Sequence, residues 1–285
     1  MRYQSIFRPD LLQGQVIVVT GGGSGIGRAI AHEVASLGAH VVLAGRQLAK
    51  LESTRDEIAA ASPSVSVFQC NIRQEEQIKA LVDTVLGQHG RLDALVNNAG
   101  GQFMSPAEAI SSKGWNAVIE TNLTGTFLMS REAYNRYFRQ HGGNIVNIIA
   151  DMWRGFPGMA HTGAARAGVE NLTKTLAVEW ARSGVRVNAV APGLIEGNGI
   201  LQYGEGMLPF IQAMKTDIPL KRMGTEAECA AAVTFLLSPA AAYITGETIK
   251  VDGAYALWRK TWDIEDHDNA PPPYVGFVNG DEGNS

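Results

Sequence analysis

The sequence has little cysteine, no excess of basic charge and no long apolar run. Its two cysteines, Cys70 and Cys229, lack metal-ligand spacing, so we expect buried free thiols and no metal site. A formal net charge of −4 disfavours nucleic acid and anionic membranes as partners, because both attract basic surfaces. No apolar stretch is long enough to span a membrane, and residues 1–5 do not resemble a signal peptide. We therefore expect a cytoplasmic protein.

What the sequence does contain is an alternation of short apolar runs and helical patterns. The apolar runs are predicted strands, at 15–19, 39–44, 65–70, 93–97, 144–149, 185–191 and 248–251. Helices are predicted between them, at about 28–35, 47–61, 75–87, 113–140, 162–182 and 226–237. Continuous apolar strands that alternate with helices predict an α/β fold, a single Rossmann-type, doubly wound parallel sheet with helices on both faces.

The predicted fold occupies residues 15–258 and is flanked by two other segments. Residues 1–14 are expected to form an irregular lead-in. The tail, 259–285, is polar and contains the run Pro271-Pro272-Pro273. Its composition fits an ordered arm on a neighbouring subunit and partial disorder equally well.

A glycine-rich turn follows the first predicted strand. It reads Thr20-Gly21-Gly22-Gly23-Ser24-Gly25-Ile26-Gly27, with the spacing Gly21-x-x-x-Gly25-x-Gly27. A strand, a glycine turn and a helix in this order direct backbone N–H groups at a phosphate, and glycine lets the phosphate approach the main chain. The alternative is a tight turn that binds nothing.

The end of the second predicted strand indicates which dinucleotide is preferred. An acidic residue at this position holds the 2′-hydroxyl of NAD, but the sequence here is Ala44-Gly45-Arg46. Arg46 offers a planar cation suited to a 2′-phosphate, and Arg28 is a candidate for a second positive charge. We therefore predict NADP(H), the alternative being that Arg46 is an ordinary solvated surface residue.

Five motifs in order and spacing resemble the short-chain dehydrogenase/reductase family: Thr20-Gly21-x-x-x-Gly25-Ile26-Gly27, Asn97-Asn98-Ala99-Gly100, Thr121-Asn122-Leu123, Pro192-Gly193 and Val251-Asp252-Gly253. The resemblance covers about residues 13–255. It implies a nicotinamide cofactor and a homotetramer assembled through helices 113–140 and 162–182. It also implies cofactor contacts from Gly21, Ser24, Gly25, Ile26, Gly27, Asn71, Ile72, Asn98, Ala99, Gly100, Arg166, Pro192, Gly193 and Ile195.

The chain departs from this family at the residues that normally carry out hydride chemistry. The family uses a serine, a tyrosine and, four residues after the tyrosine, a lysine. At these positions the chain has Ile149 and Ala150, Thr162 and Arg166. An unaided threonine hydroxyl cannot take a proton from an alcohol near neutral pH, and a charged arginine cannot relay one.

A narrower resemblance agrees with this altered chemistry. The stretches 71–73, 100–103, 161–169 and 266–269 are similar to peroxisomal trans-2-enoyl-CoA reductases, which reduce a carbon–carbon double bond with NADPH. The mitochondrial 2,4-dienoyl-CoA reductases also lack the tyrosine. The same stretches are similar to bacterial proteins assigned to citronellol and citronellal oxidation.

Reduction of an enoyl thioester needs donors for the enolate oxygen and a proton for the α-carbon. The predicted donors are Asn122, Thr162 and Arg166. Candidate proton sources are Asp151, His161 and Tyr203, each of which also has a structural explanation: a strand-end cap, a helix-start residue and an apolar part of a substrate lid.

Three functions remain open at this stage. The first is an NADPH-dependent reductase that acts on a small apolar enoyl thioester. The second is a terpenoid alcohol dehydrogenase with an unusual base. The third is a dinucleotide-binding scaffold that has lost its chemistry, which the absence of serine, tyrosine and lysine favours and the retained Asn122 does not.

Overall fold

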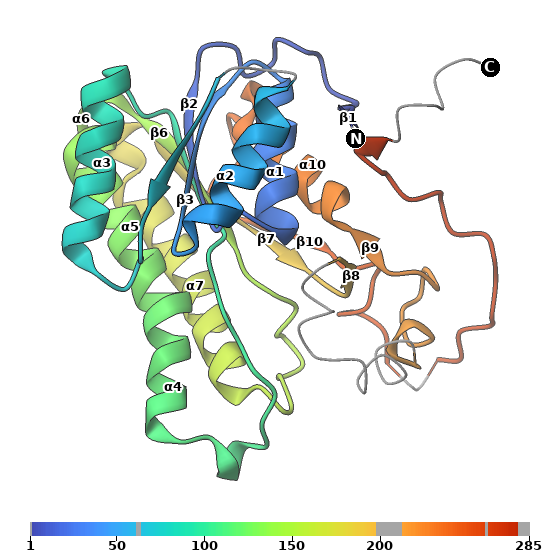
Figure 1. Ribbon diagram of the computed structural model, residues 1–285. Helices are drawn as coiled ribbons and strands as arrows, with labels where there is room; N and C mark the ends of the chain where they lie inside the picture. Colours follow the sequence, from blue (N-terminus) through green and yellow to red (C-terminus); the bar gives the residue numbers. More distant parts are fainter. Residues whose placement is uncertain (1, 61–63, 198–212, 260–261, 279–285) are drawn as a thin grey trace, which may run out of the picture.

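The core of the protein is a seven-stranded, fully parallel sheet. The computed structural model describes residues 2–60, 64–197, 213–259 and 262–278 (Figure 1). The sheet strands are β2 (Val16–Thr20), β3 (His40–Gly45), β4 (Val65–Gln69), β5 (Ala94–Asn97), β6 (Gly143–Ile148), β7 (Val185–Pro192) and β10 (Thr248–Val251). Their spatial order is β10-β7-β6-β5-β2-β3-β4. The predicted doubly wound α/β fold is therefore confirmed.

The strand order reverses between β2 and β5, which pair with each other at the centre of the sheet. From β2 the chain winds outward through β3 and β4, then returns and winds the other way from β5. Ligands of open parallel sheets bind at such a switch point, beyond the carboxyl ends of the strands. The glycine turn follows β2 and Asn98 follows β5, so both lie at this point.

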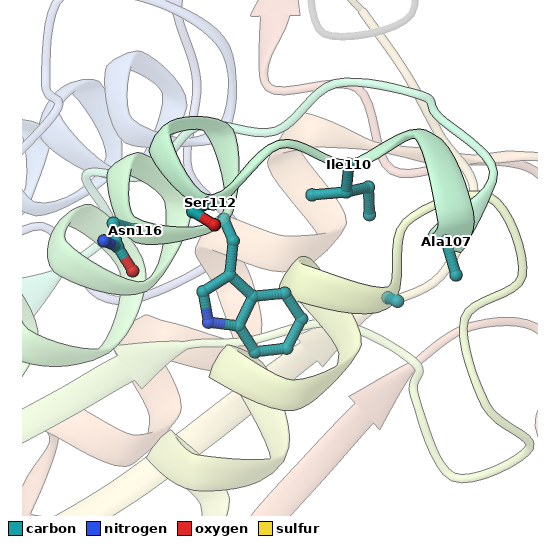
Figure 2. Close-up of a pocket in the computed structure, with 6 residues that line it drawn as sticks. Ala107, Ile110, Ser112 and Asn116 are labelled. Atoms are coloured by element: carbon teal, nitrogen blue, oxygen red, sulfur yellow. The ribbon is translucent and has the colours of Figure 1, made fainter.

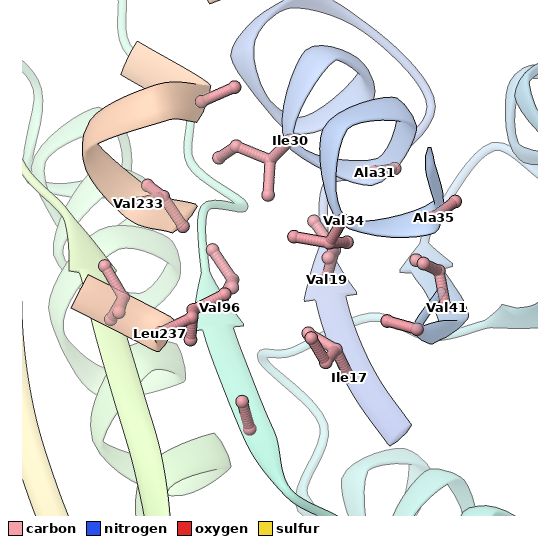
Figure 3. Close-up of a cluster of buried hydrophobic side chains, with 14 of the residues drawn as sticks. Ile17, Val19, Ile30, Ala31, Val34, Ala35, Val41, Val96, Val233 and Leu237 are labelled. Atoms are coloured by element: carbon pink, nitrogen blue, oxygen red, sulfur yellow. The ribbon is translucent and has the colours of Figure 1, made fainter. Parts of the chain in front are cut away.

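Helices cover both faces of the sheet, which explains why its strands are apolar throughout. Successive strand residues point to opposite faces. Ile17 and Val19 pack on the side of α1 and α10 (Figure 3). Val16 and Val18 pack on the other side. The first face carries α1 (Gly25–Ser36), α2 (Leu48–Ala59) and α10 (Glu226–Leu237); the second carries α3 (Glu75–His89), α5 (Gly125–Ala133) and α7 (Ala160–Glu179).

The helix expected at 113–140 is interrupted by two wider π-helical turns. It consists of α4 (Ser112–Ile119), a π turn (Glu120–Thr124), α5, a second π turn (Tyr134–Phe138) and α6 (Arg139–His141). Such turns are rare and frequently occur at functional sites. The first of them carries Asn122, which is fully buried. Short 3₁₀ turns lie at Ala107–Ala109, Ala181–Ser183 and Pro239–Ala241.

The lead-in and the tail form structure with each other, which the sequence analysis did not anticipate. Strand β1 (Arg2–Tyr3) pairs antiparallel with β11 (Phe277–Val278). The tail reaches this position along the side of the molecule (Figure 1), where Thr225 Oγ1 donates to Tyr274 O at 2.6 Å. At its end, the buried Glu33 carboxylate accepts hydrogen bonds from Ser5 and Tyr274. The described part of the tail therefore packs on its own chain.

Two further short strands, β8 (Ile195–Glu196) and β9 (Gly224–Thr225), pair with each other beside the sheet. Within the described part of the chain, no helix combines the length and the apolar character that a membrane crossing needs.

Candidate active site

A threonine hydroxyl fastens the glycine turn to the end of β5. Thr20 Oγ1 accepts hydrogen bonds from the backbone N–H groups of Asn98 and Ala99, both at 3.0 Å. The Asn98 side chain donates back to Thr20 O at 2.9 Å. Thr20 belongs to the glycine motif, but the motif alone assigns it no role. Its position at the end of β2, directly before Gly21, is the feature of the sequence that could have indicated this contact.

The turn fits a dinucleotide diphosphate. Gly21 has φ +68, and a Cβ on Gly27 would lie 2.3 Å from Gly21 O, so a side chain is excluded at these positions. Ser24 precedes α1, but its side chain makes no capping hydrogen bond, and the first turn of α1 has no acidic residue. No side chain of α1 itself caps this positive end, which favours an anion, and the Glu226 carboxylate of α10 lies nearby, 3.7 Å from where a Cβ on Gly25 would be.

The two arginines expected at the 2′-phosphate differ in their surroundings. Arg46 follows β3 and is exposed. Arg28 instead pairs with Glu57, its Nε donating to Oε2 at 2.7 Å, and its guanidinium lies 4.3 Å from the centre of the Phe277 ring. The expectation that Arg28 adds a free positive charge is therefore wrong, because Glu57 neutralises it.

Asn71 and Ile72, the residues expected near the adenine, follow β4. Asn71 Oδ1 accepts a hydrogen bond from Arg73 N at 3.2 Å, which closes a local turn. Ile72 is buried, and its side chain packs against Gly125 at the start of α5. Both residues thus shape the end of β4.

Asn122 holds the loop after β5 rather than presenting a free amide. Its Oδ1 accepts from Gly101 N and its Nδ2 donates to Gly101 O, both at 2.9 Å. This arrangement uses one of the two amide N–H groups that we predicted as donors for the oxyanion. A Cβ on the neighbouring Gly100 would lie 2.8 Å from Asn122 Oδ1 and 2.5 Å from Arg166 Nη2. The missing side chain of Gly100 therefore lets Asn122 and Arg166 converge on this loop.

Arg166 is a buried cation on α7. Its Nη1 donates to Ile148 O at 2.7 Å, at the end of β6. Its Nε has no hydrogen-bond partner among the described residues. Burial lowers the pKa of Arg166 to about 10, so the guanidinium still carries its charge at neutral pH. An uncompensated buried charge of this kind stabilises a negative charge that develops nearby.

His161 and Thr162, at the start of α7, are both fully buried and bonded to each other. Nδ1 of His161 lies 2.8 Å from Thr162 N and 3.2 Å from Thr162 Oγ1. Nε2 of His161 has no hydrogen-bond partner among the described residues. Burial lowers the pKa of this imidazole, which disfavours the charged form that a proton source needs. The Thr162 hydroxyl thus has a partner in His161, and the catalytic roles that the sequence suggested for both residues stay predictions.

Asp151 lies close to a second carboxylate, Asp252, where β6, β7 and β10 end. Burial, and next the negative charge of Asp252, raise the pKa of Asp151. Asp252 lies against Gly193, and its two carboxylate oxygens accept from Ala254 N and Ala256 N at 2.9 and 3.0 Å. The sequence analysis gave Asp252 no role, because its contact with Asp151 joins segments about a hundred residues apart.

Pro192 is the last residue of β7, next to β10. Gly193 follows it, and Gly193 N donates to Val251 O at 3.0 Å. Ile195 follows in β8 and packs on Gly224. The remaining candidate, Tyr203, lies outside the described residues, as do Met207, Leu208, Phe210 and Ile211 of the expected apolar wall.

An uncharged hollow lies between α4, the loop before it and the start of α7. It has a volume of about 300 Å³ and is lined by Ala107, Ile110, Ser112, Trp115, Asn116 and Ala160 (Figure 2). Ala160 directly precedes His161 on α7. Phe103 and Met104, both exposed, add apolar surface along the loop after β5. The hollow is therefore next to the buried polar groups and suits an apolar chain.

Comparisons with known proteins identify relatives of this chain. A family model described as enoyl-(acyl carrier protein) reductase matches residues 21–256. The chain is 42% identical, over 252 residues, to a probable 2,4-dienoyl-CoA reductase of Bacillus subtilis (strain 168). The match covers 86% of this chain and 98% of that protein. It is 41% identical to a peroxisomal 2,4-dienoyl-CoA reductase of Danio rerio, with 88% and 85% covered.

Among solved structures, the fold is similar to that of a citronellol catabolism dehydrogenase of Pseudomonas aeruginosa PAO1. The TM-score is 0.81 at 54% sequence identity, and the match covers 89% of this chain and 100% of that one. The relatives thus include proteins named as 2,4-dienoyl-CoA reductases and a citronellol catabolism dehydrogenase.

Proposed function

Because this chain belongs to the short-chain dehydrogenase/reductase family and is an oxidoreductase, we propose that it reduces a carbon–carbon double bond of an apolar enoyl-CoA with NADPH. The observation that carries this proposal is the chemistry of the buried groups. Arg166 is a charged donor with a free Nε, and the Thr162 hydroxyl is bonded to His161. Arg166 can therefore stabilise a negative oxygen, and neither Arg166 nor Thr162 is a base for an alcohol.

The cofactor part of the proposal rests on the chain's own residues. The N-terminus of α1, which has no side-chain cap from Ser24, would hold the diphosphate, and Arg46 would pair with a 2′-phosphate. Bound NADPH supplies a hydride to the substrate. The charge of Arg166 then favours the oxyanion that forms on the thioester.

Asp151 is the proposed source of the proton for the α-carbon. Its raised pKa keeps the proton on the carboxyl group to a higher pH than usual, as a general acid requires. Asp252 beside it supports the same protonation state, because two carboxylates in contact resist simultaneous ionisation. The acid can act through one water molecule.

The substrate part of the proposal is supported by the relatives and by the hollow next to α4. Two relatives are named as 2,4-dienoyl-CoA reductases, and the hollow carries no charge. A second candidate, oxidation of a terpenoid alcohol, is favoured by the 54% identity to the citronellol catabolism dehydrogenase.

A substrate panel tests the proposal. Cofactor consumption or formation is followed with trans-2-enoyl-CoAs, 2,4-dienoyl-CoAs, citronellol and citronellal, with NADPH or NADP⁺ as appropriate. We expect turnover of the acyl thioesters to exceed that of the terpenoids. Oxidation of citronellol without reduction of any enoyl-CoA would instead support the second candidate.

A further inference from the structure

A buried donor without a partner marks the first turn of α7. His161 is 0% exposed, and its Nε2 has no hydrogen-bond partner among the described residues. Buried polar atoms of native proteins are nearly always hydrogen-bonded, to protein, water or ligand. His161 Nε2 and Arg166 Nε, both on α7, lack a partner among the described residues. The Nε2 atom is therefore available to a ligand atom or a water molecule.

Thr162 determines which nitrogen of His161 carries the proton. The backbone N–H of Thr162 is shared between His161 Nδ1 at 2.8 Å and Met159 O at 2.9 Å. Because an N–H can only donate, Nδ1 accepts in this contact and carries no proton of its own. The Thr162 hydroxyl, 3.2 Å from the same atom, adds a second donor. A neutral imidazole then has its proton on Nε2. Burial lowers the pKa of His161, and the positive end of α7 acts in the same direction.

We propose that His161 donates a hydrogen bond from Nε2 to the carbonyl oxygen of the acyl substrate, and that Thr162 is the positioning residue that keeps the proton on Nε2. The inference rests on the proposed function and deepens it. When the β-carbon receives the hydride, the electron pair of the double bond moves onto the thioester oxygen. The Nε2–H bond to that oxygen strengthens, and no proton leaves the imidazole. The proton for the α-carbon comes from Asp151.

The ring of Phe103 packs on the imidazole of His161. The centres of the two rings lie 4.4 Å apart in an edge-to-face arrangement. Phe103 belongs to the segment between β5 and the 3₁₀ turn at Ala107–Ala109, which has no helix or strand, and it is 39% exposed. An outward turn of this ring admits the carbonyl. The acyl chain then passes Ala160, the residue before His161, into the hollow beside α4.

Two matched pairs of variants test the proposal. His161→Gln retains an N–H donor near the position of Nε2, whereas His161→Phe retains a ring without a donor. Thr162→Ser retains the hydroxyl, whereas Thr162→Val removes it. With trans-2-decenoyl-CoA and NADPH, we expect kcat to fall about 100-fold in His161→Phe, the usual effect of losing one oxyanion donor, and less than tenfold in His161→Gln. Thr162→Val should lie between them. NADPH affinity and the melting temperature report whether each variant is folded.

Nitrogen NMR of the unmodified protein provides a readout that does not depend on turnover. We expect His161 to be neutral with its proton on Nε2, and the Nε2–H signal to move on addition of decanoyl-CoA, which has the carbonyl but no double bond. In Thr162→Val the backbone N–H still donates to Nδ1 and only the hydroxyl donor is lost. The form with its proton on Nε2 should remain the major one, with a larger share of the Nδ1-protonated form than in the unmodified protein.

The outcomes separate this inference from the proposed function. A proton on Nδ1, full activity in folded His161→Phe, or equal loss in His161→Gln and His161→Phe overturns the role of His161 while the reductase function stands. No reduction of any enoyl-CoA by the unmodified protein overturns the proposed function itself.

Discussion

Asp151, the proposed general acid, lowers the free energy of unfolding of the protein at neutral pH. Burial and the neighbouring Asp252 raise its pKa above the ordinary value of 3.8 that it has in the unfolded chain. As pH rises past 3.8, the unfolded chain releases this proton first, so the folded protein then binds more protons. The free energy of unfolding therefore decreases with rising pH until Asp151 is ionised in the folded state as well.

Asp151→Asn should be more stable and less active than the unmodified protein. The gain in the free energy of unfolding should be absent well below pH 3.8 and should appear above it, because asparagine does not ionise. The reductase kcat should fall by about 100-fold or more, as expected for a lost general acid. Denaturant unfolding between pH 3 and 7 and a rate measurement check both parts. Unchanged activity would exclude Asp151 as the proton source.

Arg46 decides the preference between the two dinucleotides in this account. Arg46→Ala should weaken NADPH binding by about 1.5–3 kcal/mol, the contribution of a charge-assisted hydrogen bond, and leave NADH binding almost unchanged. Titration calorimetry with both cofactors measures the effect. Arg28→Ala is the comparison, because Glu57 already neutralises that residue and its loss should matter less. Equal affinity of the unmodified protein for both cofactors would contradict the assignment.

At the scale of elements, the hollow beside α4 is expected to determine which chain lengths are accepted. Ala107 lines it, whereas Ala109, in the same 3₁₀ turn, is exposed and does not. Ala107→Leu should fill the hollow and lower kcat/KM for long-chain enoyl-CoAs about tenfold, since each displaced methylene group is worth about 0.8 kcal/mol. Crotonyl-CoA should be affected little.

Ala109→Leu is the matched control and should leave both substrates unaffected. Equal losses for the short and the long substrate in Ala107→Leu would show that the hollow does not hold the acyl chain.

The elements themselves could be predicted because their signals are local. Continuous apolar runs such as Val16–Val19 predict buried parallel strands, and the glycine turn predicts the strand-to-helix connection. Other features depend on contacts that the chain makes only when folded. Strands β1 and β11 are two residues each, too short for a periodic pattern, and they pair across the whole length of the chain.

The sequence predicts which residues belong to the candidate site, but not the contacts that they make. The motifs indicated Asn122 and Thr162 as donors to the substrate. In the structure one N–H of the Asn122 amide donates to Gly101 O, and Thr162 Oγ1 lies 3.2 Å from His161 Nδ1. The surroundings of each group decide whether a donor is free, and sequence spacing does not report them. The pairing of Arg28 with Glu57 is a further example.

At the scale of the whole molecule, α5 and α7 present an apolar face that we expect to be covered in a homotetramer. A second hollow lies between them and is lined in part by Leu123, Phe127 and Leu172. Val178 on α7 is 79% exposed. Self-complementary contact of such a face produces closed two-fold symmetry.

Light scattering at micromolar concentration should therefore show a tetramer. Phe127→Glu should shift it to smaller species, because a charge would be buried in the interface. Ser53→Glu, an exposed change on α2 on the other face of the sheet, should have no effect. A monomer formed by the unmodified protein would contradict the assembly.

In the proposed reaction, the site adds hydride and a proton across a carbon–carbon double bond. Mass spectrometry of the product formed from trans-2-decenoyl-CoA and NADPH in heavy water is the decisive test of this reaction. We expect decanoyl-CoA with one deuterium on the α-carbon, delivered through an exchangeable acid such as Asp151, and ordinary hydrogen from NADPH on the β-carbon. Unchanged trans-2-decenoyl-CoA, from protein that binds NADPH and oxidises citronellol, would contradict it.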